Sequence, residues 1–372
     1  MKRLYIIAGE ASGDNLGASV LRALPGAEVS GVGGASMESL GFRSLFDINE
    51  IAVGGISEAL PCIFKIMRLI KLTVEDIVST NPGVVLTIDS PEFCFRVAKR
   101  IRAMRPEIKL VHLVAPSVWA WRPGRAKSLA KIYDHILTLF EFEPQYFTKH
   151  GLQATFVGHP AAEEFPEGDS QKKPILILMP GSREQEIKRH LPIFLEAAKN
   201  IKFLSASMQG GVDLGEKHVD IDRVVIPTLS SVEPLVRSIV GDSEIEVVSD
   251  EARKMAIYRS ARSAVVASGT ATLHLALSSC PMVVCYKLSY LSYAIIRPLV
   301  KVKFISLVNI ILGRGVVPEL IQSACNAKAI VNAISDIDEM DQMDSFRAMR
   351  QKLTPGCPQS EMIATMMMRY LV

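Results

Sequence analysis

Two loops of small and polar residues, one in each half of the chain, have the composition of an anion-binding turn. Gly9–Asp14 follows the apolar run Leu4–Ala8, and a helical pattern comes next. Pro180–Arg183 follows the apolar run Ile175–Met179 in the same way. In α/β proteins a strand, such a loop and a helix form the βα turn that faces phosphates or nucleotides. Two of these turns predict two Rossmann-like domains that face each other across a cleft.

A third loop of this kind, Ser268–Ala271, follows the apolar run Ala264–Ala267 and opens another helical pattern. Its small side chains would let an anion reach the N–H groups at the helix start, where the helix dipole also favours negative charge. The loop therefore fits a sugar-nucleotide diphosphate site. A plain helix start that Ser or Thr caps has the same composition and is the alternative.

Arg183 stands at the end of the second loop, where a guanidinium can neutralise a departing diphosphate. A surface arginine paired with Glu184 or Glu186 is the alternative. None of the loops reads Gly-x-Gly-x-x-Gly, and no acidic residue stands at the end of a second strand as a dinucleotide site needs. The sequence therefore disfavours a dehydrogenase.

Asp89 directly follows the apolar run Val84–Ile88 and precedes Ser90 and Pro91, which suit the start of a helix. The carboxyl end of a strand is a common position for a catalytic carboxylate. Asp89 is thus a candidate catalytic carboxylate, and a carboxylate that stabilises the helix start is the alternative.

Both tryptophans of the chain, Trp119 and Trp121, lie in one segment with Arg122, directly after the apolar run Lys109–Val114. Two indole rings above a sheet can form a wall for sugar or acyl groups. Buried packing of one of the two rings is the competing interpretation.

These candidates need strands that end at one edge of a sheet, and the chain alternates apolar runs with helical patterns as a doubly wound parallel sheet does. The predicted strands of the first half are Leu4–Ala8, Val29–Val32, Val84–Ile88, Lys109–Val114, Ile136–Leu139 and Thr155–Val157. Those of the second half are Ile175–Met179, Val224–Ile226, Glu244–Val248, Ala264–Ala267 and Met282–Tyr286. The polar segment 158–174 is predicted to link the two domains, residues 1–160 and 174–345. A last helix is predicted within residues 346–372.

Composition limits the class of function. The 372 residues suffice for two α/β domains, and the net charge of +3 is too small to argue for nucleic acid. The cysteines form no C-x-x-C pair and the histidines no cluster, so the sequence offers no metal site, and we expect no cofactor. No run of about 20 apolar residues predicts a membrane-spanning helix.

Two stretches are apolar and basic at once. Residues 56–72 carry large apolar side chains at helical spacing, with Lys65, Arg68 and Lys71 between them, and residues 286–312 have a similar mixture. Such segments can lie in a membrane interface beside anionic headgroups. Helices packed on the sheet with their lysines reaching into solvent are the alternative.

Together these segments resemble the lipid-A-disaccharide synthase family of glycosyltransferases over nearly the whole chain. The resemblance rests on residues 8–14, 88–93, 116–122, 180–183 and 267–271, with a late match at Asn309, Gly313-Arg314 and Pro318–Leu320. The string P-S-V-W-A-W-R at 116–122 is the most specific of them. The family implies a GT-B architecture, with an N-terminal acceptor domain, a C-terminal UDP-sugar domain, and a last helix in residues 346–372 that crosses back to the first domain.

The resemblance also implies a reaction and roles. UDP-2,3-diacylglucosamine and 2,3-diacylglucosamine 1-phosphate (lipid X) would give a β-1,6-linked disaccharide and UDP, with Asp89 as general base and Arg183 at the leaving group. The donor site would contain Gly181, Ser182, Arg183, Ser268, Gly269, Thr270, Ala271, His274 and Asn309. The acceptor side of the cleft would contain Glu10, Ser12, Asp14, Trp119, Trp121 and Arg122.

The chain departs from its family at two positions. His274 stands where the family usually has the Glu that holds the ribose hydroxyls, and Val308 stands where it tends to have Pro. A neutral imidazole can also bind hydroxyls, and we expect that function to fail below about pH 6.5, where histidine ordinarily takes up a proton.

The sequence therefore predicts an inverting lipid glycosyltransferase, cytoplasmic and peripheral at the inner face of a Gram-negative inner membrane. It leaves open whether the chain forms a homodimer. An enzyme similar to UDP-GlcNAc 2-epimerase and an inactive membrane protein that binds nucleotide sugars are the two rival functions.

Overall fold

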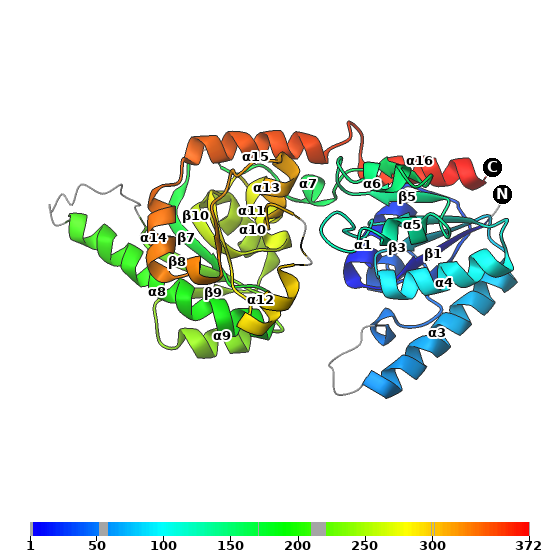
Figure 1. Cartoon of the computed structure of the whole chain (residues 1–372), viewed down its shortest axis with the longest axis horizontal. Coiled ribbons are helices and arrows are strands. Elements are labelled where there is room, and N and C mark those ends of the chain that lie inside the picture. The colour runs from blue at the N-terminus through cyan, green and yellow to red at the C-terminus, as the bar shows by residue number, and fades with distance from the viewer. Residues whose placement is uncertain are drawn as a thin grey trace. The chain divides into compact units, whose positions relative to one another are not determined.

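The computed structural model describes residues 3–51, 59–169, 171–209, 221–298, 300 and 302–371. The chain divides into two compact units (Figure 1). The first comprises Met1–Pro160 and Leu353–Val372, and the second comprises Ala161–Lys352. The segment 158–174, predicted to be a linker, contains the short helix α7 (Ala161–Glu164) and the start of a strand.

The first unit is built on a parallel six-stranded sheet in the order β2-β1-β3-β4-β5-β6. Its strands lie close to the predicted ranges: β1 (Leu4–Ala8), β2 (Val29–Val32), β3 (Val84–Ile88), β4 (Lys109–Leu113), β5 (His135–Thr138) and β6 (Gln153–Phe156). The apolar runs were recognisable because helices cover both faces of the sheet, so successive strand residues are all buried.

The helices of the first unit form two layers. They are α1 (Ala11–Arg22), α2 (Ala35–Glu38), η1 (Ile48–Glu50), α3 (Ala59–Thr80), α4 (Pro91–Met104), α5 (Arg125–Leu129), α6 (Gln145–Thr148) and α16 (Gln359–Leu371). Tyr5 and Ile7 of β1 share a core cluster with α3 and α4, whereas Leu4 and Ile6 share another with α1 and α16. The alternation is that of a strand, whose successive side chains point to opposite faces.

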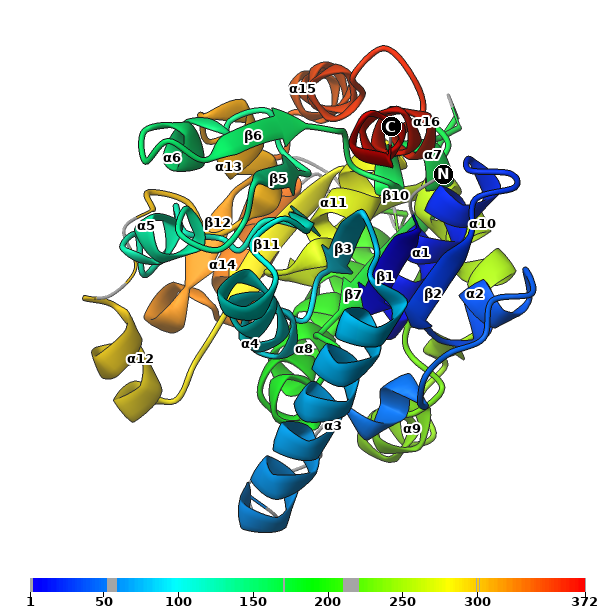
Figure 2. The same cartoon turned by 90° about the vertical axis from the view of Figure 1, so that its right-hand side faces the viewer.

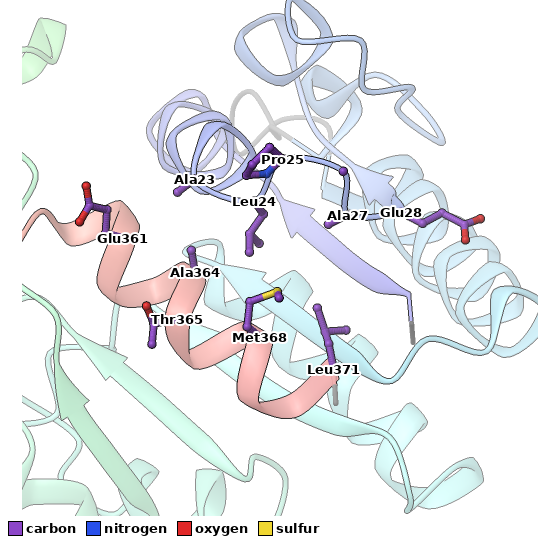
Figure 3. A pocket seen from close by; sticks show the side chains of 11 residues that line it. Ala23, Leu24, Pro25, Ala27, Glu28, Glu361, Ala364, Thr365, Met368 and Leu371 are labelled. Carbon is purple, nitrogen blue, oxygen red and sulfur yellow. The ribbon is translucent and has the colours of Figure 1, made fainter.

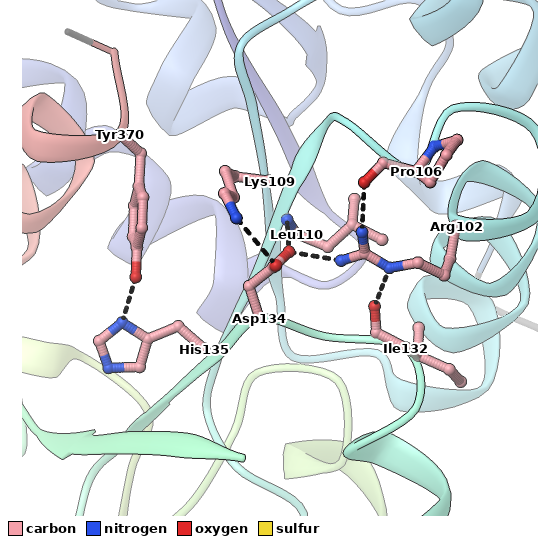
Figure 4. Close-up of polar contacts among 8 residues, drawn as sticks. All are labelled: Arg102, Pro106, Lys109, Leu110, Ile132, Asp134, His135 and Tyr370. Atoms are coloured by element: carbon pink, nitrogen blue, oxygen red, sulfur yellow. Dashed lines mark hydrogen bonds and ion pairs between the residues drawn. The ribbon is translucent and has the colours of Figure 1, made fainter. Parts of the chain in front are cut away.

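Polar contacts hold α4 and α16 to this sheet (Figure 4). The guanidinium of Arg102 on α4 donates to the carbonyl oxygen of Ile132 at 2.8 Å and also pairs with Asp134, which precedes β5. His135 Nδ1 and the Tyr370 hydroxyl of α16 lie 2.9 Å apart. The last helix is therefore part of the first unit through both apolar packing and a hydrogen bond.

The second unit repeats the parallel design with the strand order β12-β11-β10-β7-β8-β9. Its strands are β7 (Lys173–Met179), β8 (Arg223–Pro227), β9 (Glu246–Val248), β10 (Ala261–Ala267), β11 (Met282–Tyr286) and β12 (Glu319–Ile321). Strand β12 was not predicted, because three half-buried residues that include a glutamate give no apolar run.

Helices flank this second sheet as well. They are α7, α8 (Glu184–Gln209), α9 (Glu233–Val240), α10 (Glu251–Ser260), α11 (Thr270–Leu277), α12 (Tyr290–Ile296), α13 (Leu307–Leu312), η3 (Gln322–Ala324), α14 (Ala327–Ser335) and α15 (Glu339–Leu353). Among the helices that the structure describes, none is both long and apolar enough to cross a bilayer.

Candidate active site

The first candidate site lies where the first sheet changes its winding direction. From β1 the chain moves outward to β2 and then returns to the other side of β1 to form β3, so β1 and β3 are neighbours (Figure 2). The helices that follow them, α1 and α4, cover opposite faces of the sheet. Ligands of open α/β sheets bind at the carboxyl ends of such a strand pair. The loop after β1 holds Glu10 and Ser12, and Asp89 comes directly after β3.

The backbone at this edge is strained. Asp89 and Ser90 both have positive φ angles, 52° and 40°, and Val114 at the end of the adjacent β4 has a φ of 71°. Each such residue costs on the order of 1–3 kcal/mol, and conformations of this kind cluster at functional sites. The strained residues thus lie at the carboxyl ends of β3 and β4, and one of them is Asp89, the candidate base.

Short polar contacts join the two loops. The Ser12 hydroxyl lies 3.4 Å from Asp89 Oδ2, and the Ser90 hydroxyl lies 3.3 Å from Glu10 Oε1. A side chain at Gly9 would put its Cβ 2.4 Å from the Ser90 hydroxyl oxygen, so only glycine permits this approach. Glu10, Ser12 and Asp89 thus lie close together at one edge of the sheet.

Asp89 and Asp14 have different tasks. The only backbone N–H that Asp89 contacts in the described chain is that of Ser90, at 2.9 Å, so it does not cap the first turn of α4. Asp14, expected to line the cleft, is instead buried, and its carboxylate accepts the N–H groups of Gly34, Ser36 and Met37 at the start of α2. Asp14 therefore positions a loop.

The tryptophan segment follows β4, the next strand of the sheet. Trp119 is half-buried against Phe142, and its indole N–H donates to Glu143 Oε1 at 3.0 Å. Trp121 is 45% exposed, and the guanidinium carbon of Arg122 lies 4.3 Å from its ring centre. One ring therefore packs inside the unit, and the other is free to contact a ligand.

Glu143 is a buried carboxylate that the sequence analysis missed. Its Oε2 accepts the N–H groups of Leu139 and Phe140 at 3.2 Å, and burial raises its pKa to about 7. It fixes Trp119 to the loop after β5. The sequence does not tell which of Glu141 and Glu143 is the buried carboxylate, because both follow a strand in the same polar segment.

The second candidate site occupies the corresponding position in the other sheet. From β7 the chain winds outward through β8 and β9, then returns to form β10 on the opposite side of β7. The loop Gly181–Arg183 follows β7, and Ser268–Ala271 follows β10. Both loops line one cavity of about 520 Å³, together with His274. Two loops that lie far apart in the sequence thus form one site.

Among the described residues no side chain caps the start of α11, although Ser and Thr stand there. The Ser268 hydroxyl donates instead to the carbonyl oxygen of Ile305 at 2.7 Å, and Gly269 is the residue before the helix. The N–H of Thr272 donates to the carbonyl oxygen of Gly269 at 3.1 Å, so the N–H groups of Thr270 and Ala271 are the ones that keep their capacity to bind an anion. The alternative of a plain capped turn does not describe this helix start.

Arg183 is 82% exposed at its side chain and lies 3.4 Å from Glu186 Oε1. A long, exposed ion pair of this type contributes little free energy, so the guanidinium remains available to a phosphate. Gly181 has a φ of 117°, and a Cβ there would come within 2.5 Å of Glu186 Oε2. Glycine at this position lets the loop pass close to the first turn of α8.

His190 on α8 holds this loop to its neighbour. Its Nδ1 lies 2.8 Å from the carbonyl oxygen of Pro180, and its Nε2 accepts the N–H of Lys287 at 3.0 Å. The ring is therefore a neutral tautomer that donates through Nδ1, and burial lowers its pKa. It ties the ends of β7 and β11 together.

His274 lines the cavity with its ring stacked on Phe165, the two ring centres 4.2 Å apart. Burial lowers its pKa to about 4, and the smaller effects of Glu251 and Lys254 oppose each other. The expectation that His274 takes up a proton below about pH 6.5 is therefore wrong, because the buried ring stays neutral well below that value.

Lys254 was not recognised from the sequence. It is only 5% exposed and donates to the carbonyl oxygen of Thr228 at 3.2 Å and to Glu251 Oε1 at 2.6 Å. It lines the same cavity as His274. In the sequence it stands beside Arg253 in a charged helix, where spacing alone does not tell a buried cation from an exposed one.

Asn309, expected to contact the donor, is 1% exposed and fully hydrogen-bonded within the chain. Its amide nitrogen donates to Val317 O and Glu319 Oε1, both at 2.9 Å, and its Oδ1 accepts the N–H groups of Val316 and Val317. These contacts use both donors and both lone pairs of the side chain. In this structure Asn309 stabilises the turn before β12, and its side chain has no hydrogen-bonding group left for a ligand.

A further cavity of about 750 Å³ lies between the α1–β2 connection and α16 (Figure 3). Ala23–Glu28 precede β2, so this cavity is at the amino-terminal edge of the first sheet, opposite the candidate base. Its position argues against a part in the chemistry. Across the described ranges no cluster of three or more potential metal ligands occurs.

Solved structures show which class of fold this is. The chain superposes on a putative UDP-N-acetylglucosamine 2-epimerase from Listeria monocytogenes with a TM-score of 0.60 at 16% identity, over 98% of this chain and 94% of that one. A UDP complex of Staphylococcus aureus MnaA gives a TM-score of 0.61 at 14% identity, over 100% and 98%. The predicted two-domain α/β architecture of the GT-B type is confirmed.

Sequence comparison then gives the family. The family model for lipid-A-disaccharide synthetase matches residues 4–366. Lipid-A-disaccharide synthase of Rickettsia akari is 39% identical over 353 residues, which cover 91% of this chain and 86% of the relative. The Rickettsia bellii (strain OSU 85-389) protein is 40% identical over 351 residues, covering 91% and 89%. The chain belongs to the lipid-A-disaccharide synthase family, and the prediction of a glycosyltransferase is confirmed.

Proposed function

We propose that the chain joins UDP-2,3-diacylglucosamine to 2,3-diacylglucosamine 1-phosphate and releases UDP. Family membership supports this reaction. The observation that carries it is that each of the two units has a strand edge with its own chemistry. One offers the carboxylate of Asp89, and the other offers the uncapped α11 start beside Arg183.

In this proposal Asp89 accepts the proton of the acceptor 6-hydroxyl while that oxygen attacks the anomeric carbon of the donor. The bond from this carbon to the diphosphate oxygen breaks, and UDP leaves with the electron pair. Attack from the side opposite the leaving group inverts the anomeric carbon and gives a β-1,6 linkage. Ser12 supports the role of Asp89, because its hydroxyl points toward the same carboxylate.

We assign the donor to the cavity of the second unit. The loop Gly181–Arg183 and the first N–H groups of α11 bind the diphosphate, and Arg183 offsets the charge that develops on departing UDP. Neutral His274 contributes a ring nitrogen to a ribose hydroxyl. Trp121 with Arg122 forms an exposed surface for the acceptor sugar.

Transfer assays separate this function from its rivals. UDP release that requires both lipids supports the transferase. An epimerase would convert UDP-N-acetylglucosamine with no second substrate, and a binding protein without turnover would bind UDP and release none. The resemblance to epimerases at 16% identity or less concerns the fold alone.

We further propose that the outer face of α3 places the enzyme on the inner face of the inner membrane. Ile63, Phe64 and Met67 are 53%, 74% and 37% exposed, an unusual concentration on one helix. Tyr290 and Leu291 of α12 are exposed as well, at 87% and 73%. Residues 52–58, which include the start of the apolar stretch predicted from the sequence, lie outside the described residues.

A further inference from the structure

A cavity of about 720 Å³ in the first unit opens beside the candidate base. Its polar end is formed by Glu10 and Ser90, whose side chains are in hydrogen-bond contact next to Asp89. Ligand pockets of proteins usually measure roughly 300–1,000 Å³, so the cavity is large enough for part of a substrate.

The rest of the cavity wall is largely apolar. Ile48, Ile51, Ile66 and Phe93 line it, and all belong to or pack against the core between the sheet and α3. Ile63 also lines it while being 53% exposed. The apolar wall therefore reaches the same outer face of α3 that carries exposed Phe64.

One cation stands in this wall. Arg96, in the second turn of α4, lines the cavity, and its guanidinium has no hydrogen bond or ion pair within the part of the chain that the structure describes. The nearby Glu92 is engaged with Arg125 at 2.9 Å. An exposed arginine without a carboxylate partner, set beside apolar side chains, is suited to a phosphate group on an apolar molecule.

We propose that this cavity binds the acceptor lipid, with Arg96 on its phosphate and the isoleucine wall around one acyl chain. The inference rests on the proposed function and assigns residues to the acceptor. The required ligand combines a hydroxyl-bearing ring for Glu10, a phosphate for Arg96 and an apolar chain, and a diacylglucosamine phosphate has all three. The phosphate of an anionic membrane lipid offers similar chemistry, and the experiment distinguishes the two sources.

The first test compares acceptors with and without the 1-phosphate. Arg96→Gln should raise KM for the phosphorylated acceptor about 10-fold, because a charge-assisted hydrogen bond is lost, and should leave kcat and the KM of the dephosphorylated acceptor nearly unchanged. Lys99→Gln is the matched control, since Lys99 is an exposed cation of the same helix that does not line the cavity.

Three results would overturn the assignment. They are an unchanged KM in Arg96→Gln, an equal rise for both acceptors, or a loss of binding to anionic vesicles with no change in KM. The last result would assign Arg96 to the membrane lipid instead. An inactive wild-type protein would instead refute the proposed function, so the two failures are distinguishable.

The second test concerns the acyl chain. Ile66→Trp should narrow the cavity, raising KM for a long-chain acceptor several-fold and sparing a short-chain one. Met104→Trp is the control, because Met104 ends the neighbouring helix α4, is 57% exposed and lies outside the cavity. If Ile66→Trp fails to fold, Ile51→Ala should weaken the preference for long chains. Unchanged chain-length preference in a folded variant would refute the acyl site.

Discussion

His274 offers a test of the second site that depends on its buried, neutral state. The change is His274→Phe, which keeps an aromatic ring to stack on Phe165 and removes the titratable nitrogen. We expect the variant to lose part of the acid sensitivity of the wild-type fold. The expectation follows from the pKa of His274, which burial lowers from 6.5 to about 4.

The magnitude follows from proton linkage. Above about pH 6.5 the imidazole is neutral in both the folded and unfolded chains, so it adds no pH dependence. As the pH falls from 6.5 towards 4, the unfolded chain takes up a proton that the folded chain does not, and the free energy of unfolding decreases. At about pH 5 this loss amounts to roughly 2 kcal/mol.

Urea unfolding followed by circular dichroism at about pH 7.5, 6 and 5 measures the effect. The other buried histidines are present in both proteins, so the difference between wild type and His274→Phe isolates this side chain. The wild type should lose about 2 kcal/mol more than the variant between the highest and lowest pH. Equal pH dependence in both proteins would refute the argument from burial.

The same neutral state makes a prediction for nucleotide binding. Between about pH 7.5 and 5.5 the UDP affinity of the wild type should change with pH no more than that of His274→Phe, because His274 does not titrate there and the terminal phosphate of UDP titrates alike with both proteins. His274→Glu should bind UDP more tightly if position 274 contacts the ribose, since a carboxylate is the stronger acceptor. Identical affinities in both proteins would rule out that contact.

Three further predictions concern residues at the two strand edges and on α3. Asp89→Asn should fold and bind UDP but lose on the order of 10²–10⁴ in transfer rate, and near wild-type turnover would place the base elsewhere. Arg183→Ala should weaken UDP binding about 10-fold or more and affect donor use more than acceptor use; unchanged UDP affinity and turnover would make it a surface residue. Phe64→Ser combined with Met67→Ser should reduce liposome binding and lipid transfer without lowering the thermal midpoint or UDP affinity, whereas a large loss of stability would mean that the side chains are buried in the core.

The fold was largely predictable because its main signal is local. A strand buried on both faces must be a continuous apolar run, and Val84–Ile88 and Met282–Tyr286 have the predicted bounds. Strand β12 escaped prediction, since Glu319 belongs to it through backbone pairing with Val284 of β11, and its carboxylate accepts the N–H groups of Ile305 and Ser306. Tertiary contacts determine such a strand.

The site was predictable only in part. Positions after strands follow from topology, which is why Asp89 and the loops after β7 and β10 emerged from the sequence. The partners of a polar side chain do not follow from spacing. The side chains of Asp14 and Asn309 accept hydrogen bonds from backbone N–H groups of neighbouring loops. Lys254 is buried, although the charged residues beside it in the sequence are typical of an exposed position.

The most direct test of the central claim is the structure of the reaction product. The purified chain is supplied with UDP-2,3-diacylglucosamine and 2,3-diacylglucosamine 1-phosphate, and the product is analysed by NMR. We predict a disaccharide whose new bond joins the donor anomeric carbon to O6 of the acceptor in the β configuration, with one UDP released for each bond formed. An α-linked product, a bond at another hydroxyl, or UDP released without a disaccharide would contradict an inverting transfer initiated at Asp89.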